Sequence, residues 1–254
     1  MQDVPQRRAL SAMLSDLVNA SSVPDVWACF ADALAAYGFD KLLYGSARFP
    51  DGRFLGDPAE ALILYQGAQE YVDAYMEEEL YLHSPTYEWA TKNRGFVSWP
   101  EAIRQYGKMP TPQQMRIMQL NAKVGAVAGY VGSLVGVVPG MNGVIGVSPR
   151  AGLNQLQTDA LWARVGKDIE TLCNLMHLRV SSLPQTGQRR PLTTRQREAL
   201  EWYSLGKTTQ DIATIMDLSI GTVEKHLKMA RDALDASNTA HAVRKAAALN
   251  LLTA

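Results

Sequence analysis

The side chains with the most definite chemistry lie near the carboxyl end of the chain, in a segment with helical spacing. Lys225, Lys228 and Arg231 could bind phosphate oxygens or reach guanine. Glu224 could accept a hydrogen bond from cytosine, and Thr222 could contact a thymine methyl group. Charged helix faces often only contact solvent, so whether this face binds DNA depends on the elements that carry it. The expected exposed face comprises Thr222, Glu224, Lys225, His226, Lys228, Met229 and Arg231.

Two amphipathic helices separated by a tight turn would position this face. Thr208 or Thr209 can cap the first helix, and Asp211 suits the positive end of its dipole. Ser219 can cap a second, longer helix. The buried stripe of that helix is expected to be Val223, Leu227, Ala230 and Leu234. A short helix, a turn and a longer helix form the helix-turn-helix layout, which predicts that the polar face contacts DNA.

A denser pattern extends over residues 192–252. Its members are Leu192, Thr193, Arg195, Leu200, Gly206, Lys207, Thr208, Ile212, Ala213, Thr222, Val223, His226, Asn238, Ala242 and Val243. With these residues the segment resembles the DNA-binding domain of the LuxR family of bacterial transcription factors, which implies double-stranded DNA as a partner. The residues expected to bind it are Lys207, Thr208, Thr222, Glu224, Lys225, His226, Lys228 and Arg231. The family's Glu after the arginine is Gln196 here, and Glu198 is expected to take over part of its capping role.

Composition and charge support a two-part organisation. The net charge is zero, yet residues 185–254 hold 10 Lys and Arg against 7 Asp and Glu, and residues 1–184 hold 15 against 18. The basic carboxyl-terminal part fits phosphate binding. Cys29 and Cys173 lie far apart, and the four histidines lack metal-ligand spacing, so neither a disulfide framework, a metal site nor a cofactor is expected. The polar amino-terminal residues do not resemble a signal peptide, and we expect a cytoplasmic protein.

The uncharged stretch from Val124 to Val147 could be mistaken for a membrane span. The turn sequence at 139–143 and several glycines favour two buried strands joined by a hairpin, and no membrane is expected as a partner. A preceding helix over 111–123 is expected to turn Met115, Met118 and Leu120 inward. Residues 95–100 are expected to form a short strand that stops at its proline.

A long helix is predicted from Leu153 to Leu183. Its apolar seam comprises Leu161, Val165, Ile169, Leu172, Leu175 and Met176, which could pack on its own domain or against the same helix in a homodimer. A polar, proline-containing linker is predicted over 181–191. The domains expected are therefore 1–180 and 192–254. We predict an α+β chain, with an α/β/α sandwich around a central antiparallel sheet and then an all-α helix-turn-helix domain.

The first domain carries aromatic and glycine residues at a recognisable spacing: Tyr71, Tyr75, Ser84-Pro85, Trp99, Gly125 and Gly129. With these it resembles the LuxR-type ligand domain that binds acyl-homoserine lactones. The resemblance implies a small-molecule signal bound by Tyr71, Tyr75, Ser84, Trp99, Gly129 and Ser148. Three departures fall on polar contacts: Tyr71 stands for the family's Trp, Ser84 for its Asp, and Gly67 for its Tyr. Loss of that carboxylate weakens the case for an unmodified lactone.

Several alternatives remain open. The aromatic residues could be plain core residues, and the chain could be a LuxR-type regulator that responds to another signal or needs none. A phosphorylated receiver domain does not fit, because the first strand follows two helices and lacks an acidic pair. No nucleophile–base pair, metal cluster or phosphate loop indicates an enzyme. An inhibitory partner forming heterodimers is disfavoured by the intact polar helix. We therefore expect a homodimeric regulator that binds a palindromic DNA site.

Overall fold

The centre of the first structural unit is an antiparallel sheet with the strand order β2-β1-β5-β4-β3. The computed structural model describes residues 9–48, 54–56, 61–106, 110–184 and 191–252, and the chain divides into Met1–Ser181 and Ser182–Ala254. The strands are β1 (Phe39–Arg48), β2 (Leu62–Gln66), β3 (Gly95–Ser98), β4 (Tyr130–Ser133) and β5 (Met141–Pro149). The predicted central antiparallel sheet is thus confirmed.

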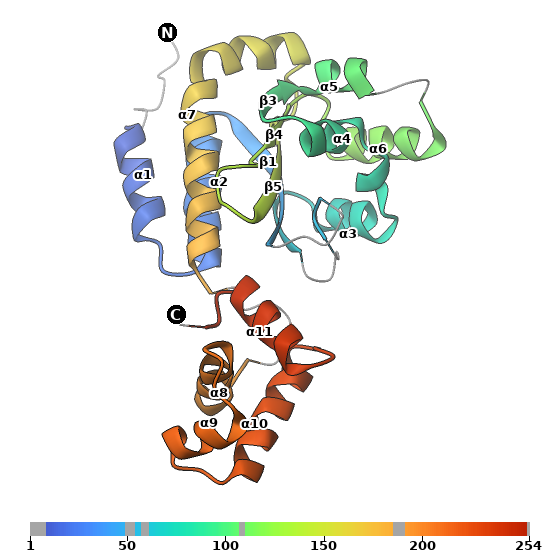
Figure 1. Ribbon diagram of the computed structural model, residues 1–254. Coiled ribbons are helices and arrows are strands. Elements are labelled where there is room, and N and C mark those ends of the chain that lie inside the picture. Colours follow the sequence, from blue (N-terminus) through green and yellow to red (C-terminus); the bar gives the residue numbers. More distant parts are fainter. Residues whose placement is uncertain (1–8, 49–53, 57–60, 107–109, 185–190, 253–254) are drawn as a thin grey trace. The chain divides into compact units, whose positions relative to one another are not determined.

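Helices cover both faces of this sheet, which confirms the predicted sandwich (Figure 1). One face carries α1 (Leu10–Asn19), α2 (Val23–Ala36) and α7 (Gln155–Ser182). The other carries α3 (Gln69–Glu77), the short 3-10 helix η1 (Leu80–His83), α4 (Pro85–Lys92), α5 (Trp99–Tyr106) and α6 (Pro112–Lys123). The second group carries most of the predicted ligand residues: Tyr71 and Tyr75 on α3, Ser84 at the start of α4 and Trp99 on α5.

The uncharged stretch forms neighbouring strands, as predicted. β4 and β5 pair antiparallel, with Tyr130 opposite Val147 and Ser133 opposite Val144. Val131, Ile145 and Val147 are buried, so this apolar sequence belongs to the domain core. Within the described residues, no helix combines the length and the apolar character needed to cross a bilayer.

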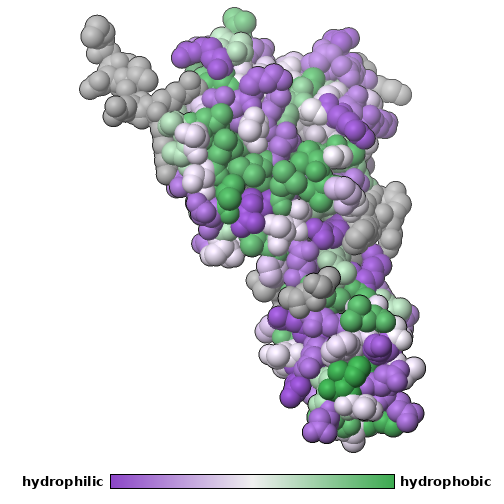
Figure 2. Space-filling view, turned by 60° about the vertical axis from the view of Figure 1, so that its left-hand side comes forward, coloured by the Kyte–Doolittle hydropathy of each residue, from purple (hydrophilic) through white to green (hydrophobic). Residues whose placement is uncertain are grey.

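The apolar seam of α7 packs on its own unit. Val165, Ile169, Leu172 and Met176 are almost completely buried on this helix, which lies beside α1 and α2 in Figure 1. The centre of the seam is therefore taken up by its own unit, and Leu161 and Leu175 are half-buried. Figure 2 shows apolar surface elsewhere on this side of the first unit. The large apolar side chains exposed on α1 and α7 are Val18, Leu156 and Leu178.

Two local expectations were wrong. The strand expected to end at Pro100 ends at Ser98, and residues 99–106 form α5. Proline is well suited to the first turn of a helix, where its missing N–H is not needed. In α6 the inward residues are Ile117 and Leu120, whereas Met115 and Met118 are 48% and 62% exposed. The register of this helix is set by its packing on η1 and α3.

The second unit consists of α8 (Thr194–Ser204), α9 (Thr209–Met216), α10 (Ile220–Ala233) and α11 (Thr239–Ala248). Its core contains Leu200, Ile212, Val223, Leu227 and Ala230. The predicted helix-turn-helix is α9 and α10, and Asp217 in the left-handed region ends α9. The all-α character of this unit is confirmed.

The capping prediction for Gln196 and Glu198 was wrong. Thr193 and Gln196 form a reciprocal capping box: Gln196 N–H donates to Thr193 Oγ1 at 3.3 Å, and Thr193 N–H donates to Gln196 Oε1 at 3.0 Å. Glu198 instead pairs with Arg195 at 2.8 Å. An amide oxygen can accept this bond as a carboxylate does, so Gln196 caps α8 without help from Glu198.

Candidate functional site

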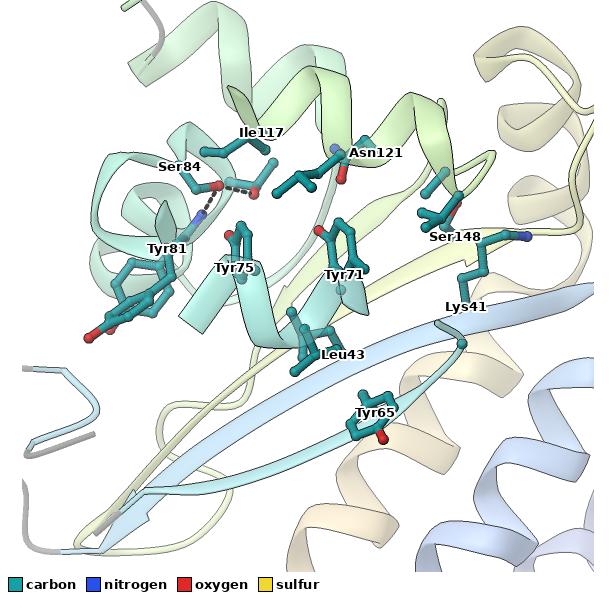
Figure 3. Close-up of a pocket in the computed structure, with 18 of the residues that line it drawn as sticks. Lys41, Leu43, Tyr65, Tyr71, Tyr75, Tyr81, Ser84, Ile117, Asn121 and Ser148 are labelled. Carbon is teal, nitrogen blue, oxygen red and sulfur yellow. Dashed lines mark hydrogen bonds between the residues drawn. The ribbon is translucent and has the colours of Figure 1, made fainter. Parts of the chain in front are cut away.

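A cavity of about 510 Å³ lies between the sheet and the helices α3 to α6. Its volume falls within the range of small-molecule sites, which are usually apolar with a few polar groups. Figure 3 shows side chains from β1, α3, η1 and α6 around this space. Among the sequence-predicted ligand residues, Tyr71, Tyr75, Ser84, Trp99 and Ser148 line it.

Tyr71 and Tyr75 present two phenol rings from one face of α3. The rings are stacked, with centroids 5.6 Å apart and planes inclined by 12°. Burial raises the pKa of Tyr75 to about 12, against a smaller opposing effect of the Ser84 hydroxyl. Burial also raises the pKa of Tyr71. Both phenols therefore stay protonated at neutral pH and can donate a hydrogen bond.

Ser84 is buried, but it is already used by the fold. Its hydroxyl caps α4 by accepting from the N–H of Tyr87 at 3.5 Å, and it lies 2.7 Å from Thr86 Oγ1. Glu70 is the one carboxylate among the described lining residues, and it pairs on the surface with Lys123 at 3.2 Å. The described lining therefore offers no buried carboxylate to a ligand.

Gly129 acts through its lack of a side chain. A Cβ atom there would lie 2.8 Å from the Trp99 ring and would also collide with the Val147 carbonyl oxygen. The backbone N–H of Trp99 donates to the backbone carbonyl of Gly129 at 3.0 Å. Gly129 therefore lets the Trp99 ring lie flush with the end of β4, and its contribution to the cavity wall is steric.

Ser148, on β5, donates its hydroxyl proton to the Ala128 carbonyl at 2.7 Å. Its oxygen can still accept a bond. Lys41, at the same end of the cavity in Figure 3, is bound to Asp40 at 2.9 Å and to the Pro149 carbonyl at 3.2 Å. This end of the cavity is polar, and the Ser148 proton and two of the three Lys41 N–H donors are already bonded within the protein.

Sequence reasoning missed further lining residues. Tyr65, Tyr81 and Tyr87 add aromatic surface, and the rings of Tyr81 and Tyr87 meet edge to face with centroids 5.5 Å apart. Asn121 adds an amide from α6. Asn121 follows Ile117 by four positions, so a correct helical register would have indicated that it faces inward.

In the second unit, α10 separates a buried face from an exposed one. Glu224, Lys225 and Lys228 are exposed, and Thr222 and His226 are half-buried. Burial of Val223 and Leu227 on the opposite face fixes how this surface is presented. The predicted base-reading and phosphate-binding groups thus share one side of the second helix of the motif.

Three predicted DNA-binding residues lie at the edges of that surface. Arg231 donates to Thr239 Oγ1 at 3.1 Å and so also ties α10 to α11. Thr208 caps α9 by accepting from the N–H of Asp211 at 3.2 Å, and its bonds to that carboxylate lower the pKa of Asp211. Lys207, just before this cap, is exposed. The described residues contain no group of His, Cys, Asp or Glu that could hold a metal ion.

Two family models match this chain. The model described as "Autoinducer binding domain" matches residues 22–180, and that described as "Bacterial regulatory proteins, luxR family" matches residues 190–246. The chain is 31% identical over 247 residues to the HTH-type quorum sensing-dependent transcriptional regulator RpaR of Rhodopseudomonas palustris. That match covers 97% of this chain and 95% of RpaR.

Solved structures of similar fold include Escherichia coli SdiA, with a TM-score of 0.52, 17% identity and coverage of 96% of this chain and 98% of that one. SdiA in complex with octanoyl-rac-glycerol gives a TM-score of 0.51 at 17% identity over the whole of both chains. These likenesses concern the fold. The family models and the similarity to RpaR show that this chain belongs to the LuxR family of quorum-sensing transcription regulators, with an autoinducer-binding domain followed by a LuxR-type helix-turn-helix.

Proposed function

We propose that this regulator binds a small amphipathic signal in the cavity of its first unit, either an acyl-homoserine lactone or a similar molecule. The observation that carries the proposal is the 510 Å³ cavity, whose mainly apolar wall includes the phenol hydroxyls of Tyr71 and Tyr75. An acyl chain would bury apolar surface against this wall. The phenols would donate to oxygen atoms of the signal.

The polar contacts decide between a lactone and another signal. The Tyr71 hydroxyl can donate to a ring carbonyl, although from a shorter side chain than tryptophan. The Ser84 hydroxyl is engaged with Thr86 and the cap of α4, so it replaces a carboxylate poorly. An amide N–H left unpaired in this cavity would weaken binding by about 1–3 kcal/mol. The alternative is therefore a regulator that responds to a non-lactone amphiphile or acts without ligand.

The proposed regulator binds a palindromic DNA site as a homodimer. Lys225 and Lys228 would bind phosphates while the neighbouring polar groups of α10 read bases. Two copies would place their α10 helices on half-sites about one helical turn apart. Leu156 and Leu178, exposed on α7, are available to a second copy. The proposal includes a cytoplasmic location and the boundaries 1–180, 181–191 and 192–254, although 1–8, 185–190 and 253–254 lie outside the described residues.

Thermal melting of the purified full chain tests the ligand, with a panel of acyl-homoserine lactones and with octanoyl-glycerol. A signal at one hundred times its dissociation constant should stabilise the protein by about 2.7 kcal/mol. A shift with octanoyl-glycerol alone would favour the non-lactone alternative. A chain that melts unchanged with every probe, yet shifts palindromic DNA in a gel, would act without these ligands. Failure to bind any such DNA would contradict the proposed output.

A further inference from the structure

Asn121 places an amide against the cavity from the inner face of α6. Its neighbours on that face, Ile117 and Leu120, are 9% and 7% exposed. The Asn121 side chain lines the cavity, and its Oδ1 atom is buried without a hydrogen-bond partner among the described residues. A buried acceptor that lacks a donor is destabilising, whereas an apolar side chain would pack there without this penalty. A hydrogen-bond donor on a bound ligand would remove this penalty.

A hydrogen-bond donor, the Tyr71 hydroxyl, lies across the cavity from Asn121. Figure 3 shows the Tyr71 ring rising from α3 toward Asn121. The Tyr71 hydroxyl makes no hydrogen bond with the described part of the chain, and its raised pKa keeps its proton in place. The two side chains thus present one donor and one acceptor to the same region of the cavity.

Ser84 lies at the other end of this polar row. In Figure 3 it is found beyond Tyr75, where its hydroxyl is engaged with Thr86 and the N–H of Tyr87. The family resemblance places an acceptor for the ligand at position 84. In this chain a buried acceptor without a partner among the described residues lies on α6 instead.

We propose that Asn121 is a specificity-determining residue whose Oδ1 accepts a hydrogen bond from an N–H or O–H group of the signal. This inference rests on the proposed function, because it requires a ligand in the cavity. The signal is then an amphiphile whose polar part holds a donor next to an acceptor, as a secondary amide or a hydroxylated ester does. Tyr71 would donate to the acceptor while Asn121 binds the donor.

Isothermal titration with matched ligands tests this role. The probes are octanoyl-homoserine lactone, its ester analogue in which oxygen replaces the amide N–H, and octanoyl-glycerol. Asn121→Leu should weaken binding of the amide by about 5- to 150-fold, because it removes the acceptor, and should leave the ester within about twofold. The same loss with octanoyl-glycerol would identify an O–H donor. Gln119→Leu makes the same chemical change on the exposed side of α6 and should bind every probe as the parent chain does.

Three results would overturn the inference. One is equal binding of the amide by the parent chain and Asn121→Leu, and another is an equal loss for amide and ester. The third is a lower melting temperature of unliganded Asn121→Leu, which would mean that the oxygen serves the fold. Asn121→Ala supplies the same comparison if the leucine variant does not fold. If the folded parent chain binds none of the three probes, the proposed ligand function is wrong, and this inference is wrong with it.

Discussion

The Tyr44 hydroxyl and the Nδ1 atom of His177 lie 2.7 Å apart and join β1 to α7 in the core of the first unit. Both side chains are completely buried. Burial, with a smaller contribution from the nearby charge of Arg48, lowers the pKa of His177 to about 4. The remaining ring nitrogen, Nε2, has no hydrogen-bond partner among the described residues. The core therefore holds a neutral histidine at neutral pH.

This histidine should make the stability of the first unit depend on pH. In the unfolded chain it titrates near its ordinary value of 6.5, whereas in the folded chain it stays neutral down to about 4. Between these values the unfolded state binds the extra proton, so stability falls as the pH falls, by roughly 3 kcal/mol in all. Calorimetry at pH 7.5, 6 and 5 measures the part of this loss that falls above pH 5, about 2 kcal/mol. His177→Gln can still bond Tyr44 but cannot titrate, and it should flatten the dependence. An unchanged slope in this variant would assign the effect to other groups.

Gly129→Ala should destabilise the first unit by about 1–3 kcal/mol, because the added methyl group meets the Trp99 ring at the end of β4. Gly146→Ala is the matched control on β5, since the nearest atom to its added Cβ, the Leu43 carbonyl oxygen, is 3.9 Å away. Urea unfolding of both variants makes the comparison. Equal midpoints would show that Trp99 moves aside without penalty.

Much of the second unit could be predicted from sequence because its determinants are local. Thr208 and Ser219 cap helices within three residues of themselves, and the stripe of α10 follows one helical period. Gln196 was misjudged for a chemical reason: its amide supplies the oxygen expected of a carboxylate.

The cavity was only partly predictable because its wall is assembled from distant segments. Tyr71 and Tyr75 followed from family spacing. Tyr65, on the edge strand β2, reaches the wall only through the pairing of that strand with β1. Asn121 faces inward because Ile117 packs beneath α6, whereas Met118 is exposed. The sequence alone does not show which apolar residues of this helix are buried, because Met115 and Met118 could also have formed its inner stripe.

Tyr71→Phe should weaken binding of a lactone or acylglycerol signal by about 3- to 10-fold, because it deletes one donor without changing the ring stack with Tyr75. The stability of the unliganded protein should change little. Tyr65→Phe is the control, since Figure 3 shows its hydroxyl pointing away from the other labelled side chains. Titration of both variants with the same signal makes the measurement. Equal affinities would exclude the Tyr71 hydroxyl from ligand contact.

Gln196→Ala should loosen the start of α8 by about 1 kcal/mol, since both bonds of its capping box involve the first turn. Glu198→Ala removes only a surface pair with Arg195 and should cost less than about 0.5 kcal/mol. Hydrogen exchange of the α8 amides, followed by mass spectrometry of the full chain, measures both. Faster exchange in Glu198→Ala than in Gln196→Ala would return the capping role to Glu198.

Lys225→Ala and Lys228→Ala should each weaken binding to all DNA sequences alike, because an exposed ammonium group binds phosphate and carries little base information. Each should also reduce the slope of log affinity against log salt concentration by about 1, since one fewer counterion is released. Lys167→Ala, on the exposed side of α7 in the first unit, is the control and should keep the parent slope. Fluorescence anisotropy with one palindromic and one unrelated duplex, over a range of salt, gives both quantities. A loss confined to the palindrome would mean that the lysine reads bases, and an unchanged slope would remove it from the phosphate contacts.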